Sequence, residues 1–193
     1  MNPGTPQTRT IVADPPWPGP IGDWRAKPLM VQEFSLNKHK RRAPSNVYPL
    51  MTLEEIAAVS PITAPKAHLW LWALPQHVDW AWQTAIVWGF KPVHLLAWAK
   101  PGFGTGGFQA NTEYIVLARK GGPTGNPFGK MPGTHFSWAR TSKHSSKPAE
   151  FFELVEKVSQ GPYLELFART RRPGWEAWGN EIDPTPAPCE PCC

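Results

Sequence analysis

The run Thr10-Ile11-Val12-Ala13-Asp14-Pro15-Pro16-Trp17 decides how this chain folds. Its first four residues are β-branched or small and apolar, a composition that favours a buried strand. Proline has no amide hydrogen to donate to a sheet, so the strand must end at Asp14. The run therefore predicts a strand whose carboxyl end opens into a loop that carries Asp14.

Four further apolar runs have the length and composition of strands. They cover residues 68–72, 93–99, 113–118 and 163–167. Nearly all of their residues are apolar, which is typical of strands that are covered on both faces. In a sheet of this kind ligands bind beyond the carboxyl ends of the strands, where Asp14 lies.

Helical patterns alternate with these strands. Thr52 and Glu55 form a capping-box signature for a helix that ends near Val59. A second helix is expected over 78–88 and a third over 148–158, and each is followed by a glycine. The apolar face expected for the second helix consists of Val78, Ala81, Trp82, Ala85 and Trp88. This order predicts an α/β fold with a mostly parallel sheet and helices on both faces.

The composition indicates one globular domain. Apolar residues make up 41% of the 193 residues and charged residues 18%, which is unlike a disordered chain. We expect residues 1–182 to form the domain and residues 183–193 to form a flexible tail rich in proline and cysteine. All three cysteines lie in this tail without the further ligands that zinc requires, so no metal site is expected.

The charge balance favours a polyanionic partner. The formal net charge is +5, and the expected long loop over 18–50 contains Lys38-His39-Lys40-Arg41-Arg42. A solvated charge run is the alternative interpretation of this segment. No apolar stretch reaches the length of a membrane span and no secretory h-region follows Met1, so we expect a cytoplasmic protein without a membrane partner.

The tetrapeptide Asp14-Pro15-Pro16-Trp17 suits the chemistry of an exocyclic amine. The adenine N6 amine is a poor nucleophile, because its lone pair is delocalised into the ring. A carboxylate can accept one N–H of the amine, a proline-locked carbonyl can accept the other, and an indole can pack on the base plane. The alternative is a turn with a packed tryptophan.

Other segments of the chain carry a family resemblance when they are taken in order. They are Val12 to Trp17, Tyr48 to Ile56, Leu69 to Trp72, Trp98 to Lys100, Glu113, His144 to Pro148, Glu165 to Arg169, Gly174-Trp175 and Trp178 to Glu181. This set resembles the bacterial branch of the MT-A family, which are N6-adenine methyltransferases related to the catalytic subunit that methylates adenosine in messenger RNA. The resemblance covers roughly residues 10 to 182. It implies a Rossmann-like methyltransferase fold with circularly permuted motifs, since the tetrapeptide precedes the cofactor-binding strand.

The resemblance also implies roles for individual residues. The catalytic set would be Asp14, Pro15, Pro16 and Trp17. The set that binds S-adenosyl-L-methionine would be Asp14, Lys147 for the methionine carboxylate, Glu165, Arg169 and Arg172 at the ribose edge, and Asn180 with Glu181 at the ribose and adenine. The substrate set would be Trp17, Tyr48, Lys100, Glu113, Lys38, Lys40, Arg41 and Arg42. The alternative is surface charge for Lys147 and Arg172 and a strand-end role for Glu165.

The function implied is transfer of a methyl group to adenine N6 in nucleic acid, with DNA favoured over RNA. An inactive nucleic-acid-binding subunit and a protein amide methyltransferase are the alternatives, and the intact tetrapeptide argues against the first. We expect no counterpart of the acidic residue that some relatives carry upstream of the catalytic strand, and no separate target-recognition domain. A homodimer or a heterodimer stays open.

Overall fold

The structure is a computed structural model that describes residues 2–18, 50–102, 111–122, 133–140, 147–180 and 182. Several residues of the predicted sites lie outside these ranges, as does the tail over 183–193. They are Lys38, Lys40, Arg41, Arg42, Tyr48 and Glu181.

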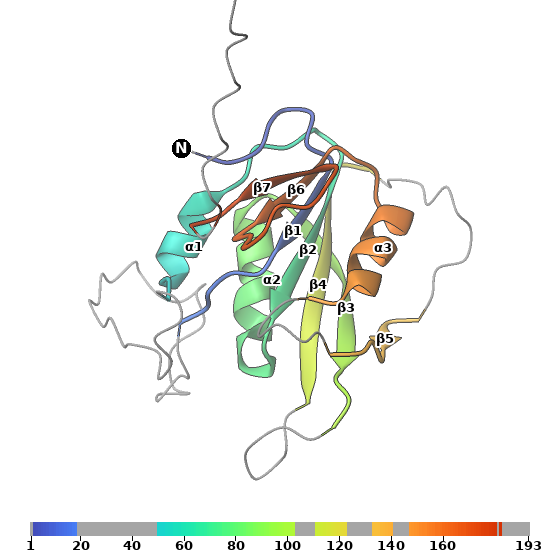
Figure 1. Cartoon of the computed structure of the whole chain (residues 1–193). Helices are drawn as coiled ribbons and strands as arrows, with labels where there is room; N and C mark the ends of the chain where they lie inside the picture. The colour runs from blue at the N-terminus through green and yellow to red at the C-terminus, as the bar shows by residue number, and fades with distance from the viewer. Residues whose placement is uncertain are drawn as a thin grey trace, which may run out of the picture.

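A seven-stranded sheet forms the centre of the described structure (Figure 1), and its order is β5-β3-β4-β2-β1-β6-β7. The strands are β1 (Thr10–Ala13), β2 (Ala67–Ala73), β3 (Lys91–Ala99), β4 (Thr112–Lys120), β5 (His135–Phe136), β6 (Tyr163–Leu166) and β7 (Trp175–Trp178). β1 pairs in parallel with β2 and β6, whereas β4 is antiparallel to both β2 and β3. The mostly parallel sheet that the sequence predicted is confirmed, with one antiparallel strand inside it.

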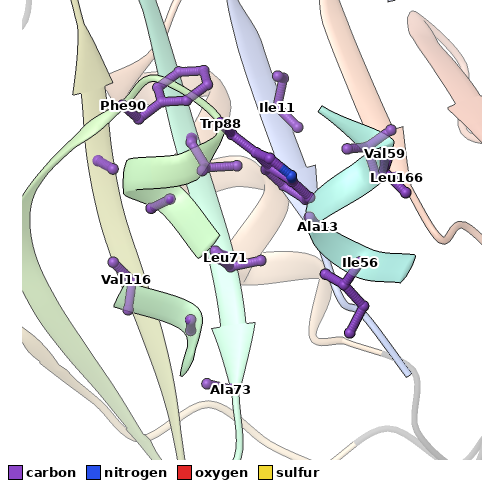
Figure 2. Close-up of a cluster of buried hydrophobic side chains, with 14 of the residues drawn as sticks. Ile11, Ala13, Ile56, Val59, Leu71, Ala73, Trp88, Phe90, Val116 and Leu166 are labelled. Carbon is purple, nitrogen blue, oxygen red and sulfur yellow. The ribbon is translucent and has the colours of Figure 1, made fainter. Parts of the chain in front are cut away.

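Alternation along each strand sends side chains to two separate cores. Ile11, Leu71 and Leu166 belong to the core on the face of α1 (Leu53–Val59) and α2 (Val78–Val87), which Figure 2 shows. Val12 and Trp72 belong to the core under α3 (Ala149–Val158) on the other face. Successive strand residues face opposite sides of a sheet, so both cores are built from the same strands. The predicted helices on both faces are therefore confirmed.

The helix ends follow the local sequence. Thr52 Oγ1 accepts a hydrogen bond from the Glu55 amide at 3.1 Å, and the Glu55 carboxylate accepts one from the Thr52 amide at 2.8 Å, which completes the expected capping box. α2 ends before Gly89, whose φ of 81° suits a residue without a side chain. Between β2 and α2 lies the short 3₁₀ helix η1 (Pro75–His77).

Three details differ from the sequence prediction. β5 and β7 were not predicted, because β5 has only two residues and β7, with the sequence Trp-Glu-Ala-Trp, lacks the β-branched residues that marked β1. The strand predicted to reach Phe167 ends at Leu166, because Phe167 has a φ of 59° and cannot continue extended backbone. Trp82 was expected on the buried face of α2 but is 38% exposed, because the smaller Ala81 and Ala85 pack on the sheet instead.

Candidate active site

The polar residues of the site come together because of strand direction. β1, β3 and β6 run the same way, so Asp14 and Lys100, which follow β1 and β3, lie at the same edge of the sheet. β4 runs the opposite way and begins at this edge, where it places Glu113. Lys147 lies two residues before α3, on the face of the sheet that α3 covers. Four charged residues from distant parts of the sequence thereby reach one place.

These residues form a chain of alternating charge. Lys147 Nζ lies 2.9 Å from Asp14 Oδ2 and 3.1 Å from Glu113 Oε2. The other carboxylate oxygen of Glu113, Oε1, accepts a hydrogen bond from Lys100 Nζ. The side chains of Lys147 and Glu113 are 10% and 13% exposed, whereas that of Asp14 is 31% exposed. Of the two carboxylates in these ion pairs, Asp14 is therefore the more open to a ligand.

Two tryptophan rings support the two lysines. Lys147 Nζ lies 4.5 Å from the ring centroid of Trp72, and Lys100 Nζ lies 4.9 Å from that of Trp98. The two rings pack edge to face, with 5.8 Å between centroids and an angle of 81°. Both tryptophans are buried in the core under α3, so the lysines rest on rigid aromatic surface.

The ion pairs keep Lys147 and Glu113 in their charged forms. Burial lowers the pKa of Lys147, but Asp14 and Glu113 outweigh burial and raise this pKa above its ordinary value. Burial raises the pKa of Glu113, but Lys147 and Lys100 outweigh it and hold this pKa below its ordinary value. Lys147 is therefore a cation at neutral pH and does not serve as a general base.

Trp17 packs inside the protein. Its indole is 6% exposed, stacks on His77 with 6.0 Å between centroids, and donates a hydrogen bond to the Trp72 carbonyl at 2.9 Å. The packing of this indole on a base plane stays a prediction; in this structure the ring belongs to the core under α1 and α2. Trp17 ties the tetrapeptide to the end of β2.

The backbone of the tetrapeptide is also fixed by hydrogen bonds. The Pro15 carbonyl accepts the Trp17 amide at 2.8 Å, and the Pro16 carbonyl accepts the Met51 amide at 2.9 Å. A carbonyl oxygen has two lone pairs, so each proline can still accept one further donor. Met51 lies two residues before α1, so this contact also brings the start of α1 next to the tetrapeptide.

His77 is a buried neighbour of the tetrapeptide that the sequence did not reveal. It is 2% exposed and lies between the rings of Trp17 and Trp80, with 4.9 Å to the Trp80 centroid. Burial lowers its pKa to about 4, although Asp79 acts in the opposite direction. His77 is therefore neutral at physiological pH and packs as an aromatic ring. A histidine directly before a helical pattern carries no signal of such a role.

Glu165 and Arg172 lie on the same face of the sheet as the charged chain. Glu165 is in register with Val12, and in the described part of the chain it has no hydrogen bond or ion pair. Burial raises its pKa to about 7, with a further rise from Asp14 and an opposing effect from Arg172 and Lys147. The Arg172 guanidinium lies 3.6 Å from the ring centroid of Phe152, and its Nε is buried without a partner among the described residues.

The remaining predicted residues follow β6 and β7. The Ala168 amide donates to the Trp178 carbonyl at 3.0 Å, so the segments that carry Arg169 and Asn180 lie side by side. Gly179 permits this approach, because a Cβ there would lie 2.3 Å from the Ala168 carbonyl oxygen. Asn180 is exposed and Arg169 is half-buried.

This chain is similar in sequence to several known methyltransferases. The profile of the MT-A70 family matches residues 8–181. The type II methyltransferase M.MunI of a Mycoplasma species is 27% identical over 90% of this chain and 77% of its own length. The N6-methyladenosine RNA methyltransferase MTA1 of Cryphonectria parasitica is 25% identical over 89% of this chain and 51% of its own length. The METTL3 subunit of the zebrafish Danio rerio N(6)-adenosine-methyltransferase is 26% identical over 70% of this chain and 25% of its own length.

This chain spans about three quarters of the bacterial relative but only half and a quarter of the two eukaryotic ones. Among the described residues, no helix has both the length and the apolar character to cross a membrane.

Proposed function

This chain belongs to the MT-A70 family, and we propose from this that it transfers the methyl group of S-adenosyl-L-methionine to the N6 amine of adenine in nucleic acid. The observation that carries the proposal is the Asp14 carboxylate at the carboxyl end of β1, 2.9 Å from Lys147 and partly open to a ligand. Two of the relatives are N6-adenosine methyltransferases or subunits of one, which supports the same reaction class.

The residues present fit this cofactor. Arg172 has a buried Nε–H without a partner among the described residues, and Glu165 is a carboxyl without one. A donor and an acceptor on one face suit the hydroxyl groups of a ribose. An ammonium has three N–H donors, so Lys147 keeps one beyond its two ion pairs for a ligand carboxylate. Once bound, the cofactor would supply an electrophilic methyl group.

The role of Asp14 is to hold the amine in place. Its carboxylate accepts one N–H of adenine N6, and a carbonyl of Pro15 or Pro16 accepts the other through its free lone pair. Fixed orientation of the two reactants is the larger contribution, because it supplies up to about 7–11 kcal/mol in favourable cases. The bonds from Trp17 to Trp72 and from Met51 to Pro16 keep the tetrapeptide rigid for this purpose.

We favour DNA over RNA as the substrate. The type II methyltransferase M.MunI is matched over 90% of this chain and 77% of its own length, whereas only 51% of the RNA methyltransferase MTA1 is matched. The eukaryotic relatives keep RNA open as the second substrate.

A radiolabelled methyl-transfer assay tests the function. We expect label in duplex or single-stranded DNA, less in RNA and none in protein, with N6-methyladenine as the labelled base. The matched control is Asp14→Asn, which keeps the shape but loses the charge and adds a donor. Because a charged hydrogen bond contributes about 1.5–3 kcal/mol, turnover should fall about ten- to hundred-fold while cofactor affinity changes little. Adenine methylation by Asp14→Asn at the wild-type rate would contradict this role.

A further inference from the structure

Glu113 has an environment that a substrate-binding carboxylate would not have. Its Oε1 accepts a hydrogen bond from Lys100 and its Oε2 lies 3.1 Å from Lys147 Nζ. Only 13% of the side chain is exposed. Both oxygens already have charged partners and the side chain is nearly buried, so little of Glu113 is open to a base.

The backbone fixes Glu113 and Lys100 relative to each other. Glu113 is in register with Trp98 on the neighbouring strand, and the Lys100 amide donates to the Asn111 carbonyl at 2.7 Å. This bond closes the open end of the β3–β4 pair. The Trp72 ring packs against Lys147 and the Trp98 ring packs against Lys100. Glu113, which is fixed in this way, therefore holds the Lys147 ammonium together with the Trp72 ring.

We propose that Glu113 is a positioning residue: anchored by Lys100, it holds the Lys147 ammonium against Asp14 and makes no direct contact with the substrate. The ion pair with Lys147 uses Asp14 Oδ2. Asp14 Oδ1 lies outside this ion pair and is left to accept the adenine amine. The inference rests on the proposed function only where it gives Asp14 the adenine amine. It replaces the substrate contact that the sequence suggested for Glu113 and Lys100.

The physical reason is that a buried ammonium needs counter-charge. Lys147 is 10% exposed, and the charged or titratable groups that face it are Asp14 after β1, Glu113 on β4 and, at longer range, Glu165 on β6. A carboxylate within about 4–6 Å favours the charged form of a lysine by about 1–3 pKa units. Removal of the Glu113 charge therefore lowers the pH at which Lys147 loses its proton, and Asp14 loses its partner there.

The test compares Glu113→Gln with Glu113→Asp and Lys100→Met. We expect Glu113→Gln to lower kcat about ten-fold or more, to leave the KM for nucleic acid nearly unchanged, and to move the alkaline limb of the pH profile down by about 1–3 pH units. Glu113→Asp should restore part of kcat. Lys100→Met removes a lysine from the same chain but keeps both carboxylates on Lys147, so it should not move the alkaline limb downward.

A second measurement separates this inference from the proposed function. The ionisation midpoint of Lys147 can be followed by NMR of isotope-labelled lysine side chains, with Lys147→Met to assign the signal. A lower midpoint in Glu113→Gln supports the positioning role even if no nucleic acid is methylated. An unchanged midpoint, or a loss confined to the KM for nucleic acid, would overturn it.

Discussion

Lys147 and Glu165 lie on the same face of the sheet, but only Lys147 has partners that outweigh the effect of burial on its charge. Lys147 keeps its charge because two carboxylates lie 2.9 and 3.1 Å from its ammonium. Glu165 has no such partner in the described chain, so burial dominates and raises its pKa to about 7. The charge of each residue is therefore set by the balance between burial, which disfavours the charged form, and the charged partners that favour it.

Glu165 should make the stability of the free protein depend on pH. Its pKa is about 7 in the folded chain and 4.5 in the unfolded chain, so the folded chain binds more protons between these values. The free energy of unfolding must therefore fall as pH rises from about 4.5 through 7. Glu165→Gln removes this dependence and should be more stable than the wild type at pH 8, by about 1–3 kcal/mol. Urea unfolding at pH 5 and pH 8 measures the difference.

The control for this experiment is Glu176→Gln, because Glu176 is an exposed carboxylate on the neighbouring strand β7. It removes the same charge without a buried group. If the wild type and Glu165→Gln lose the same free energy between pH 5 and pH 8, the protonated state of Glu165 is refuted. Stabilisation by both variants alike would instead indicate a general charge effect.

At the scale of elements, the sequence predicted what depends on local pattern. The apolar runs of β1 and β2 and the capping box of α1 each contain their own signal, and all three were found where expected. β7 was missed because its four residues pair only with β6 at the end of the sheet. A strand at the end of the sheet depends on its single neighbour for stability, which no local pattern shows.

The candidate site divides in the same way. Asp14 could be placed from sequence, because the prolines end its strand whatever the rest of the chain does. The contact of Lys147 with Glu113 could not, because it joins residues 34 positions apart and depends on β4 being antiparallel. The inward turn of Trp17 also depends on a distant partner, the Trp72 carbonyl. Tertiary contacts decided the positions that the sequence did not reveal.

Gly179 tests whether β7 positions the cofactor residues. In Gly179→Ala the new Cβ would lie 2.3 Å from the Ala168 carbonyl oxygen and 2.8 Å from its nitrogen, so the two segments must separate. We expect a loss of about 1–3 kcal/mol in unfolding free energy and weaker binding of S-adenosylhomocysteine by calorimetry. Gly122→Ala is the control, because nothing lies within 4 Å of a Cβ there. Equal behaviour of the two variants would show that the approach of β7 to Ala168 is not needed.

At the scale of the whole molecule, four lysines at the ends of strands and helices lie at the edge of the sheet opposite to Asp14. The edge that carries Asp14 also receives both ends of the segment between Pro18 and Leu50, since the Met51 amide bonds to the Pro16 carbonyl at 2.9 Å. This segment contains Lys38, Lys40, Arg41 and Arg42, which lie outside the described residues. The opposite edge carries the lysines at the other strand and helix ends, which are Lys66, Lys91, Lys120 and Lys157.

We expect the basic run to bind phosphates that flank the target base. Extrusion of an adenine from duplex DNA costs a few kcal/mol, and phosphate contacts near the site help to offset this cost. Replacement of Lys38, Lys40, Arg41 and Arg42 together by glutamine should weaken nucleic-acid binding. It should also make log K less steep against log salt, by about 0.9 for each lost contact with a duplex phosphate. Fluorescence anisotropy with a labelled duplex at several salt concentrations measures both quantities.

The matched control replaces Lys66, Lys91, Lys120 and Lys157 by glutamine, which removes the same charge from the opposite edge. If only net charge matters, both variants should lose the same affinity and salt dependence, because long-range attraction depends on total charge. If the run contacts phosphates, only its own variant should change the slope, since counterions are released where a cation meets the backbone. An unchanged slope in the variant of the basic run would assign these four residues to bulk solvent.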